Sequence, residues 1–292
     1  MTVSEAKNII KAYYGIGNPT KEDDFRFTEA CEYVIREDKD SRVMMQLGGW
    51  YYGNKEYDLA LKYYEMAESY NNPDAYGCLG YIWYYGRTGQ VDYDKAFKYY
   101  SLSAENGDLE SAYKLADMYK NGYSVEQDYE KYKSIIEDLY EKVKNDTYLF
   151  APVPQIYIRL ARIRKSEGEL EEAVNLLFYA KDFLAQRLKV NHFFGDLTSM
   201  SWLISELYDI YAFDESDFDF YDLYYLLKSP CKVSFLFEGD KYTIEATDEE
   251  GETVIRFGDK WYRTVSDFFN KAVLKGHRLT EIYNYLENFE VV

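Results

Sequence analysis

The sequence predicts a mainly α protein, a right-handed α-solenoid of helical-hairpin repeats followed by a small α+β module. The solenoid is predicted by two repetitions. The phrase YDLALKYYEMAESYN at 57–71 returns as YDKAFKYYSLSAENG at 93–107, and the segments before these phrases repeat as LGGWYYG and LGYIWYYG. Short β-prone runs after Pro230 predict the module. Periods in the thirties are typical of helical hairpins that bury their apolar faces only against neighbouring hairpins.

Residues 1–40 are expected to form a degenerate capping repeat. They carry Ile10, Tyr14, Ala30 and Val34 in an order comparable to that of the later repeats, with a longer loop between the two halves. A solenoid needs an atypical repeat at its end, because the outer face of the last hairpin meets water.

Residues 41–182 are predicted to contain four repeats. The third copy follows the second at a spacing of 36, from Leu79 to Leu115 and again from Ala96 to Tyr132. The fourth copy, RLARIRKSEGELEEAVNLLFYA at 159–180, has the shorter loop of the first copy. A small alanine recurs in three copies, where close crossing of two helices leaves little room for a side chain.

After the repeats, residues 183–230 are predicted to be closing helices and residues 231–292 the α+β module. Asp196 is expected to cap a helix that runs through LTSMSWLISELYDIYAF. The runs CKVSFLF, KYTIEAT and ETVIRF predict a meander of β-hairpins. The segments 261–276 and 279–289 show helical spacing of apolar residues, including Phe268, Phe269 and Phe289.

The charge of the chain limits its partners. Its 292 residues include 34 Lys+Arg and 52 Asp+Glu, a formal net charge of −18. Such a chain repels phosphate backbones and anionic lipid, so we expect neither nucleic acid nor membrane as a partner and favour a basic or neutral protein or peptide. No apolar run approaches the ~18 residues of a membrane span.

The cysteines and the N-terminal residues bear on location. The three cysteines are odd in number and far apart, which indicates a reducing compartment. The first residues, MTVSEAKNIIKAYY, do not resemble a secretory signal. We therefore expect a cytoplasmic protein.

The sequence gives little support for catalysis, a cofactor or a metal. His192 and His277 lie far from every cysteine, and no nucleophile-elbow motif of glycines around a serine occurs. The acidic segment FDESDFDFYD at 213–222 lacks the glycine and the final acid of an EF-hand loop, which favours a solvated, helix-capping loop. We expect no catalytic residue, no cofactor and no metal ligand.

Tyrosine is the most unusual feature of the composition, with 34 residues. On a helix that turns about 100° per residue, Leu79, Gly80 and Trp83 face inward and another stripe faces out, toward the concave surface of a solenoid. Aromatic residues and methionine are typical of protein-binding surfaces, although core packing competes for the same side chains. The candidate binding residues of this stripe are Met45 and Tyr52 in copy one, Tyr81, Tyr84 and Tyr85 in copy two, and Tyr113, Asp117 and Lys120 in copy three.

The segment LGYIWYYGRTGQVDYDKAFKYYSLSAENGDLESA at 79–112 resembles the Sel1-like repeat, a relative of the tetratricopeptide repeat with a longer loop. Copies two and three are similar to that form, and copies one and four to tetratricopeptide units. The resemblance implies an adaptor or scaffold that binds peptides or proteins and whose repeats carry no catalytic residues.

Three functions follow, in order of preference. The first is a non-catalytic scaffold that binds a peptide or protein segment in the concave groove of the repeats. The second is a regulatory sensor or neutralising partner protein whose C-terminal module contacts the target. The third is an enzyme with a site in the C-terminal module or at its junction with the helices, where clefts often form.

Overall fold

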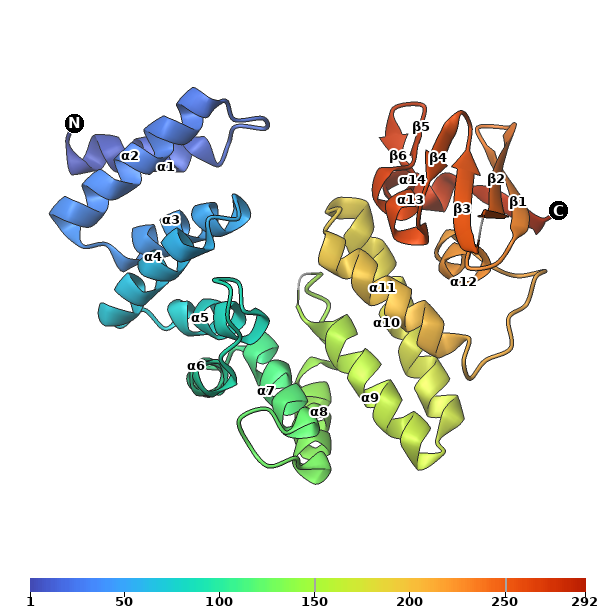
Figure 1. The fold of residues 1–292 in the computed structure, drawn as a ribbon, viewed down its shortest axis with the longest axis horizontal. Coiled ribbons are helices and arrows are strands. Elements are labelled where there is room, and N and C mark those ends of the chain that lie inside the picture. The colour runs from blue at the N-terminus through green and yellow to red at the C-terminus, as the bar shows by residue number, and fades with distance from the viewer. Residues whose placement is uncertain (150, 250) are drawn as a thin grey trace. The chain divides into compact units, whose positions relative to one another are not determined.

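The computed structural model describes residues 1–149, 151–249 and 251–292. The chain divides into two compact units, residues 1–135 and 136–292, which are coloured blue to green and green to red in Figure 1. The first unit is helical, and the second combines helices with a β-sheet. The mainly α fold with a C-terminal strand-containing module is thus confirmed, whereas the domain boundaries expected at residues 40, 182 and 230 stay predictions.

The first unit is a series of helical hairpins in which each helix from α1 to α6 packs on the next one along the chain. The hairpins correspond to the predicted cap and to the first two repeats, and α7 and α8 are the helices of the third. The elements are α1 (Val3–Tyr13), α2 (Lys21–Asp38), α3 (Ser41–Gly53), α4 (Tyr57–Ser69), α5 (Asp74–Tyr85), α6 (Tyr93–Glu105), α7 (Leu109–Asn121) and α8 (Tyr129–Val143), which begins in this unit.

Local capping residues set where these helices begin and end. The side chains of Asp92 and Asp108 accept hydrogen bonds from backbone N–H groups in the first turns of α6 and α7. These N–H groups have no acceptor within their own helix. Gly86 and Gly122 end α5 and α7 with φ angles of 59° and 69°, a left-handed conformation that glycine adopts without steric cost. The loops after α5 and α7 therefore start at the same place in copies two and three.

Each of the first two repeats is closed by a tyrosine ring that lies against a glycine. An ideal Cβ at Gly80 would lie 2.6 Å from Cδ1 of Tyr100, and one at Gly48 would lie 2.6 Å from Cε1 of Tyr64. Both rings are buried, at 2% and 5% exposure. The predicted inward positions of copy two are confirmed, because Leu79 and Gly80 are buried and Trp83 packs on the same core as Tyr100.

Adjacent glycines in α3 are expected to respond in opposite ways to alanine. Gly48→Ala forces its methyl group against the Tyr64 ring, a clash worth about 1–3 kcal/mol that exceeds the gain of about 1 kcal/mol in helix propensity. Gly49→Ala meets no atom closer than 3.9 Å and should stabilise the protein by about 0.5–1 kcal/mol. Urea unfolding of the two variants measures both effects. Equal shifts of the two midpoints would show that the ring does not lie against Gly48.

The second unit begins with a longer helical hairpin. Helix α9 (Val153–Glu167) packs on α10 (Leu170–Val190), which packs in turn on α11 (Phe194–Leu207). The hairpin α9–α10 corresponds to the predicted fourth repeat, and its Ala173 is fully buried. The shorter elements that follow are η1 (Phe220–Asp222), α12 (Leu223–Leu226), α13 (Val265–Lys271), α14 (Leu279–Ile282) and η2 (Tyr283–Tyr285).

The sheet of this unit is antiparallel, with strand order β4-β3-β2-β1-β7. Val233 pairs with Ile244, and Ile244 pairs with Phe257, so that one face presents a layer of buried side chains. The predicted β-hairpins of the meander are confirmed. The strands are β1 (Cys231–Phe237), β2 (Asp240–Glu249), β3 (Glu252–Phe257), β4 (Lys260–Tyr262) and β7 (Glu287–Val291), with β5 (Val273–Leu274) and β6 (His277–Arg278) in a separate two-stranded ribbon.

Two expectations for this unit are wrong. The helices predicted over 261–276 and 279–289 are shorter than expected. The first is limited to α13, because Trp261 lies in β4, and the second ends early, because Phe289 lies in β7. Phe289 stacks on Phe235 of the neighbouring strand at a centroid distance of 5.5 Å. Asp196 does not cap a helix: it is 3% exposed inside α11 and forms a 2.9 Å ion pair with Arg187 of α10.

A second buried ion pair joins the segment before the sheet to α10. The ammonium group of Lys181 lies 2.7 Å from Oδ1 of Asp222 and 2.9 Å from Oδ2 of Asp219. The Lys181 and Asp222 side chains are only 7% and 3% exposed, and the Tyr208 hydroxyl donates a 2.8 Å hydrogen bond to Asp222. These contacts fix η1 on the helical hairpin of the second unit.

Candidate protein-binding surface

The predicted binding residues lie on the first helices of three consecutive repeats, α3, α5 and α7. Tyr85 is exposed, at 41%. Met45 and Tyr52 border the apolar core of the first repeats. The half-buried members of the set are Met45, Tyr52, Tyr81, Tyr84, Asp117 and Lys120.

Tyr113 departs from the expected outward orientation. It is only 5% exposed, its hydroxyl donates a 3.2 Å hydrogen bond to Glu110, and the Lys114 ammonium lies 5.5 Å from its ring centroid. The expectation that its ring faces outward is wrong, because α7 covers the ring with its own neighbouring side chains. A contribution of Tyr113 to binding stays a prediction.

Five tyrosine rings in the first two repeats form a continuous series of contacts, which we call the tyrosine row. Tyr57 contacts Tyr52 at a centroid distance of 5.2 Å, and Tyr52 contacts Tyr81 at 6.0 Å, across the boundary between copies one and two. Tyr81 contacts Tyr85 at 4.4 Å, and Tyr85 contacts Tyr84 at 4.9 Å. These separations are typical of favourable aromatic pairs.

Arg87, in the loop after α5, lies on the tyrosine row. Its guanidinium carbon is 5.8, 5.5 and 5.3 Å from the ring centroids of Tyr57, Tyr81 and Tyr85, and Nη2 donates a 3.4 Å hydrogen bond to the Tyr81 hydroxyl. Within residues 1–149, 151–249 and 251–292, no carboxylate lies within 4.0 Å of this guanidinium, and its buried Nε has no hydrogen-bond partner. Arg87 is therefore a cation held by aromatic faces, without an ion pair to any residue that the structure describes.

Lys114 brings a second cation to the row from the next repeat. Its Nζ donates a 2.6 Å hydrogen bond to the hydroxyl of Tyr85 and lies 5.0 Å from the centroid of the same ring. The sequence analysis missed both cations. Arg87 directly follows the repeated LGYIWYYG, and Lys114 is one residue beyond the predicted Tyr113, so their positions beside the motif were the available indication.

The protonation states follow from burial and from these contacts. Burial raises the pKa of Tyr52 to about 12, with a further increase from Tyr81 and an opposing effect of Arg87. Burial also raises the pKa of Tyr84 far above the ordinary value, and the charge of Asp117 adds to this shift. Burial lowers the pKa of Arg87, but its hydrogen bond with Tyr81 and its electrostatic interactions with Tyr52 and Tyr81 together outweigh burial, and the pKa is raised. At neutral pH Tyr52 and Tyr84 are therefore neutral phenols, and Arg87 is a cation.

A known repeat family matches part of the first unit. The family model of the Sel1 repeat matches residues 41–69, 75–108 and 109–131, which are α3–α4, α5–α6 and α7 with the start of α8. The chain contains Sel1 repeats. Since this fold generally mediates contacts between proteins, the tyrosine row lies on helices of a type that binds protein partners.

A solved structure shows the same fold at low sequence identity. A protective antigen of uropathogenic Escherichia coli strains, which displays an SLR fold, is 18% identical, with a TM-score of 0.50 over 74% of this chain and 50% of that one. A Sel1 repeat protein from Oxalobacter formigenes is 18% identical, with a TM-score of 0.47 over 70% and 74% of the two chains. A tetratricopeptide repeat protein from Parabacteroides merdae is 14% identical, with a TM-score of 0.45 over 71% and 79%. No curated protein matches the chain.

Among the described residues, no helix has the length and apolar character needed to cross a bilayer. The same residues contain no group of three or more His, Cys, Asp or Glu side chains arranged to hold a metal ion.

Proposed function

We propose that this protein is a non-catalytic interaction scaffold whose Sel1 repeats bind a peptide or protein segment on the tyrosine row. The observation that carries the proposal is Arg87, a cation that lies on three tyrosine rings and has no carboxylate partner among the described residues. Tyrosine and arginine are the residues in which binding energy most often concentrates, because they combine large contact area with hydrogen bonding. The partly exposed Tyr85 supplies a point of contact at the edge of the row.

The expected partner is a protein or peptide that is basic or neutral overall, since the chain carries a net charge of −18. The same charge argues against nucleic acid and membrane surfaces. A reducing, cytoplasmic location remains part of the proposal, supported by three free cysteines, Cys31, Cys78 and Cys231.

Photo-crosslinking from position 85, with position 14 as the matched control, tests the binding surface.

The regulatory alternative, in which the C-terminal module contacts the target, is favoured by a pocket at the edge of that module, which is lined by residues of 216–220 and 283–289. Removing the module is a poor test, because Tyr224 stacks on Phe269 at 3.7 Å and truncation near Lys228 would expose this apolar contact to water. Point substitutions in the pocket separate the two functions without unfolding the unit.

A further inference from the structure

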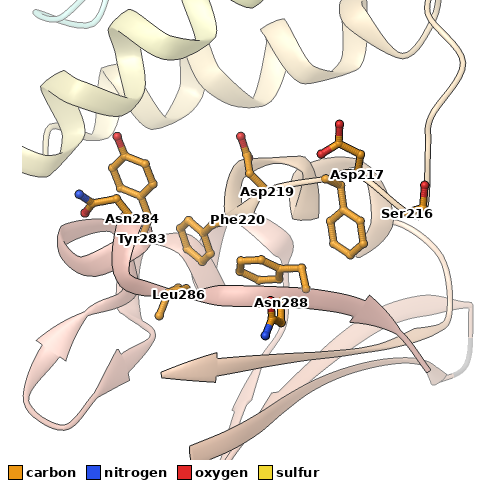
Figure 2. A pocket seen from close by; sticks show the side chains of 10 residues that line it. Ser216, Asp217, Asp219, Phe220, Tyr283, Asn284, Leu286 and Asn288 are labelled. Carbon is orange, nitrogen blue, oxygen red and sulfur yellow. The ribbon is translucent and has the colours of Figure 1, made fainter. Parts of the chain in front are cut away.

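The second unit contains a cavity of about 380 Å³, which we call the acidic pocket. One wall is the segment 216–220, which leads into η1, and the other is formed by η2 and β7 (Figure 2). The lining residues are Ser216, Asp217, Phe218, Asp219, Phe220, Tyr283, Asn284, Leu286, Asn288 and Phe289. None of them is a lysine or an arginine.

The two walls are held in place by contacts outside the cavity. Asp219 accepts a 2.8 Å hydrogen bond from the backbone N–H of Tyr221 and pairs with Lys181, which anchors the loop to α10. Phe289 stacks on Phe235 of the adjacent strand β1. Across the cavity, the rings of Phe218 and Phe289 lie 5.8 Å apart, so the opening has an aromatic floor.

The pocket carries an excess of negative charge. Asp217 has no ion-pair partner within 4.0 Å among the residues that the structure describes. Asp219 and the buried Asp222 share the single ammonium group of Lys181, and the Asp219 side chain remains 55% exposed. Figure 2 shows the carboxyl groups of Asp217 and Asp219 projecting to the same side as the hydroxyl of Tyr283. A cation that enters the cavity meets carboxylates on one wall and phenyl faces below.

We propose that the acidic pocket binds an arginine side chain of a protein partner. A guanidinium is planar, stacks on aromatic rings and accepts two-point pairing with a carboxylate, whereas an ammonium group offers only a point charge. Asn284 and Asn288 also line the cavity, and an amide carbonyl can accept a hydrogen bond from a guanidinium. The net charge of −18 favours the approach of a segment that carries such a residue. This site does not depend on the tyrosine row, so either proposal can fail without the other.

The test uses the full chain and the peptide acetyl-Gly-Gly-Arg-Gly-Gly-amide, titrated by NMR. We expect saturable shifts confined to the backbone amides of 216–220 and 283–289. Asp217→Asn should weaken binding about five-fold, the effect of losing roughly 1 kcal/mol of ion pairing. This substitution should leave the fold intact, because the Asp217 side chain makes no described hydrogen bond. Asp259→Asn, an exposed aspartate of the same unit outside the cavity, is the charge-matched control and should leave the affinity unchanged.

Three comparison ligands test which chemical group the acidic pocket recognises. The same peptide with citrulline keeps the shape of arginine without its charge and should not bind, while the lysine peptide should bind more weakly. Propylguanidinium, which carries only the charged group of the arginine side chain, should bind no more tightly than the arginine peptide. The proposal is overturned by an absence of saturable shifts up to about 10 mM peptide, equal binding of citrulline, equal weakening by Asp259→Asn, or tighter binding of propylguanidinium.

Discussion

Replacing Lys181 with methionine is expected to lower the free energy of unfolding by about 3–5 kcal/mol, because it leaves a carboxylate buried without its cation. Lys181 lies 2.7 Å from Asp222, and the two side chains are 7% and 3% exposed. Among the described residues, no cation other than Lys181 lies within 4.0 Å of the Asp222 carboxylate. Chemical denaturation followed by circular dichroism measures the loss.

The dependence of this loss on pH identifies its cause. Burial already raises the pKa of Asp222, against the opposing effect of Lys181. Without Lys181 the folded-state pKa rises further above the unfolded value. Folding then takes up a proton between these two pKa values, so the variant is most stable at low pH and loses stability as the pH rises through the folded-state pKa. The deficit relative to the parent protein should therefore shrink on acidification.

The matched control for Lys181→Met is the double variant Lys181→Met with Asp222→Asn. It removes both charges while keeping a side chain that can accept the hydrogen bond from Tyr208, and it should recover most of the lost stability. A single variant as stable as the parent protein, or a double variant no better than the single one, would show that the pair is not buried as described.

Tyr100→Ala is expected to destabilise the first unit by about 3–5 kcal/mol, the usual cost of removing a buried aromatic side chain. The ring is 2% exposed and fills the space beside Gly80, where no neighbouring Cβ is available to close the cavity that remains. It also lies 5.9 Å from the Tyr84 ring, next to the tyrosine row. Urea unfolding measures the change in stability.

Tyr100→Phe provides the control for this substitution. The Tyr100 hydroxyl is buried and has no hydrogen-bond partner in the part of the chain that the structure describes. Removing it should be neutral or slightly stabilising, because no hydrogen bond is lost and a desolvated polar group disappears. A large loss of stability in Tyr100→Phe would show that the hydroxyl group, and not only the packing of the ring, stabilises the fold.

The repeat architecture was predictable because its information is local. Tyrosine and alanine positions return at fixed spacing, and Asp92 and Asp108 mark helix starts by ordinary capping chemistry. The pairing of Tyr100 with Gly80 also follows from the repeat, since Tyr64 and Gly48 hold the same places one copy earlier. Each repeat thus confirms the interpretation of the next.

The wrong predictions for Phe289 and Asp196 in the second unit have a non-local cause. Strand β7 presents only Phe289 and Val291 as partly covered residues among exposed ones, too few to produce a recognisable alternation. Asp196 stands before an apolar run as a capping residue would, but its partner Arg187 lies in the preceding helix. In both cases a tertiary contact overrides a short local pattern.

The candidate site was predictable only in part. Helical periodicity placed Tyr52, Tyr81 and Tyr85 on one surface, but it gave no information on side chains that reach across from a loop or from the next repeat. Arg87 reaches the row from a loop and Lys114 from α7, and their contacts depend on how neighbouring hairpins stack. Tyr113 is only 5% exposed and contacts Glu110 and Lys114 of its own helix, so periodicity alone did not show that it is buried.

The most direct test of the central claim is photo-crosslinking from the tyrosine row. Benzoylphenylalanine replaces Tyr85, which is 41% exposed, or Tyr14, which is 60% exposed and lies in the capping hairpin away from the row. After irradiation in the native cells, position 85 should yield a discrete protein adduct, identified by mass spectrometry and diminished by Arg87→Ala. Position 14 should yield none, despite its greater exposure. If position 85 gives no discrete adduct, or the same products as position 14, the tyrosine row is not a binding surface.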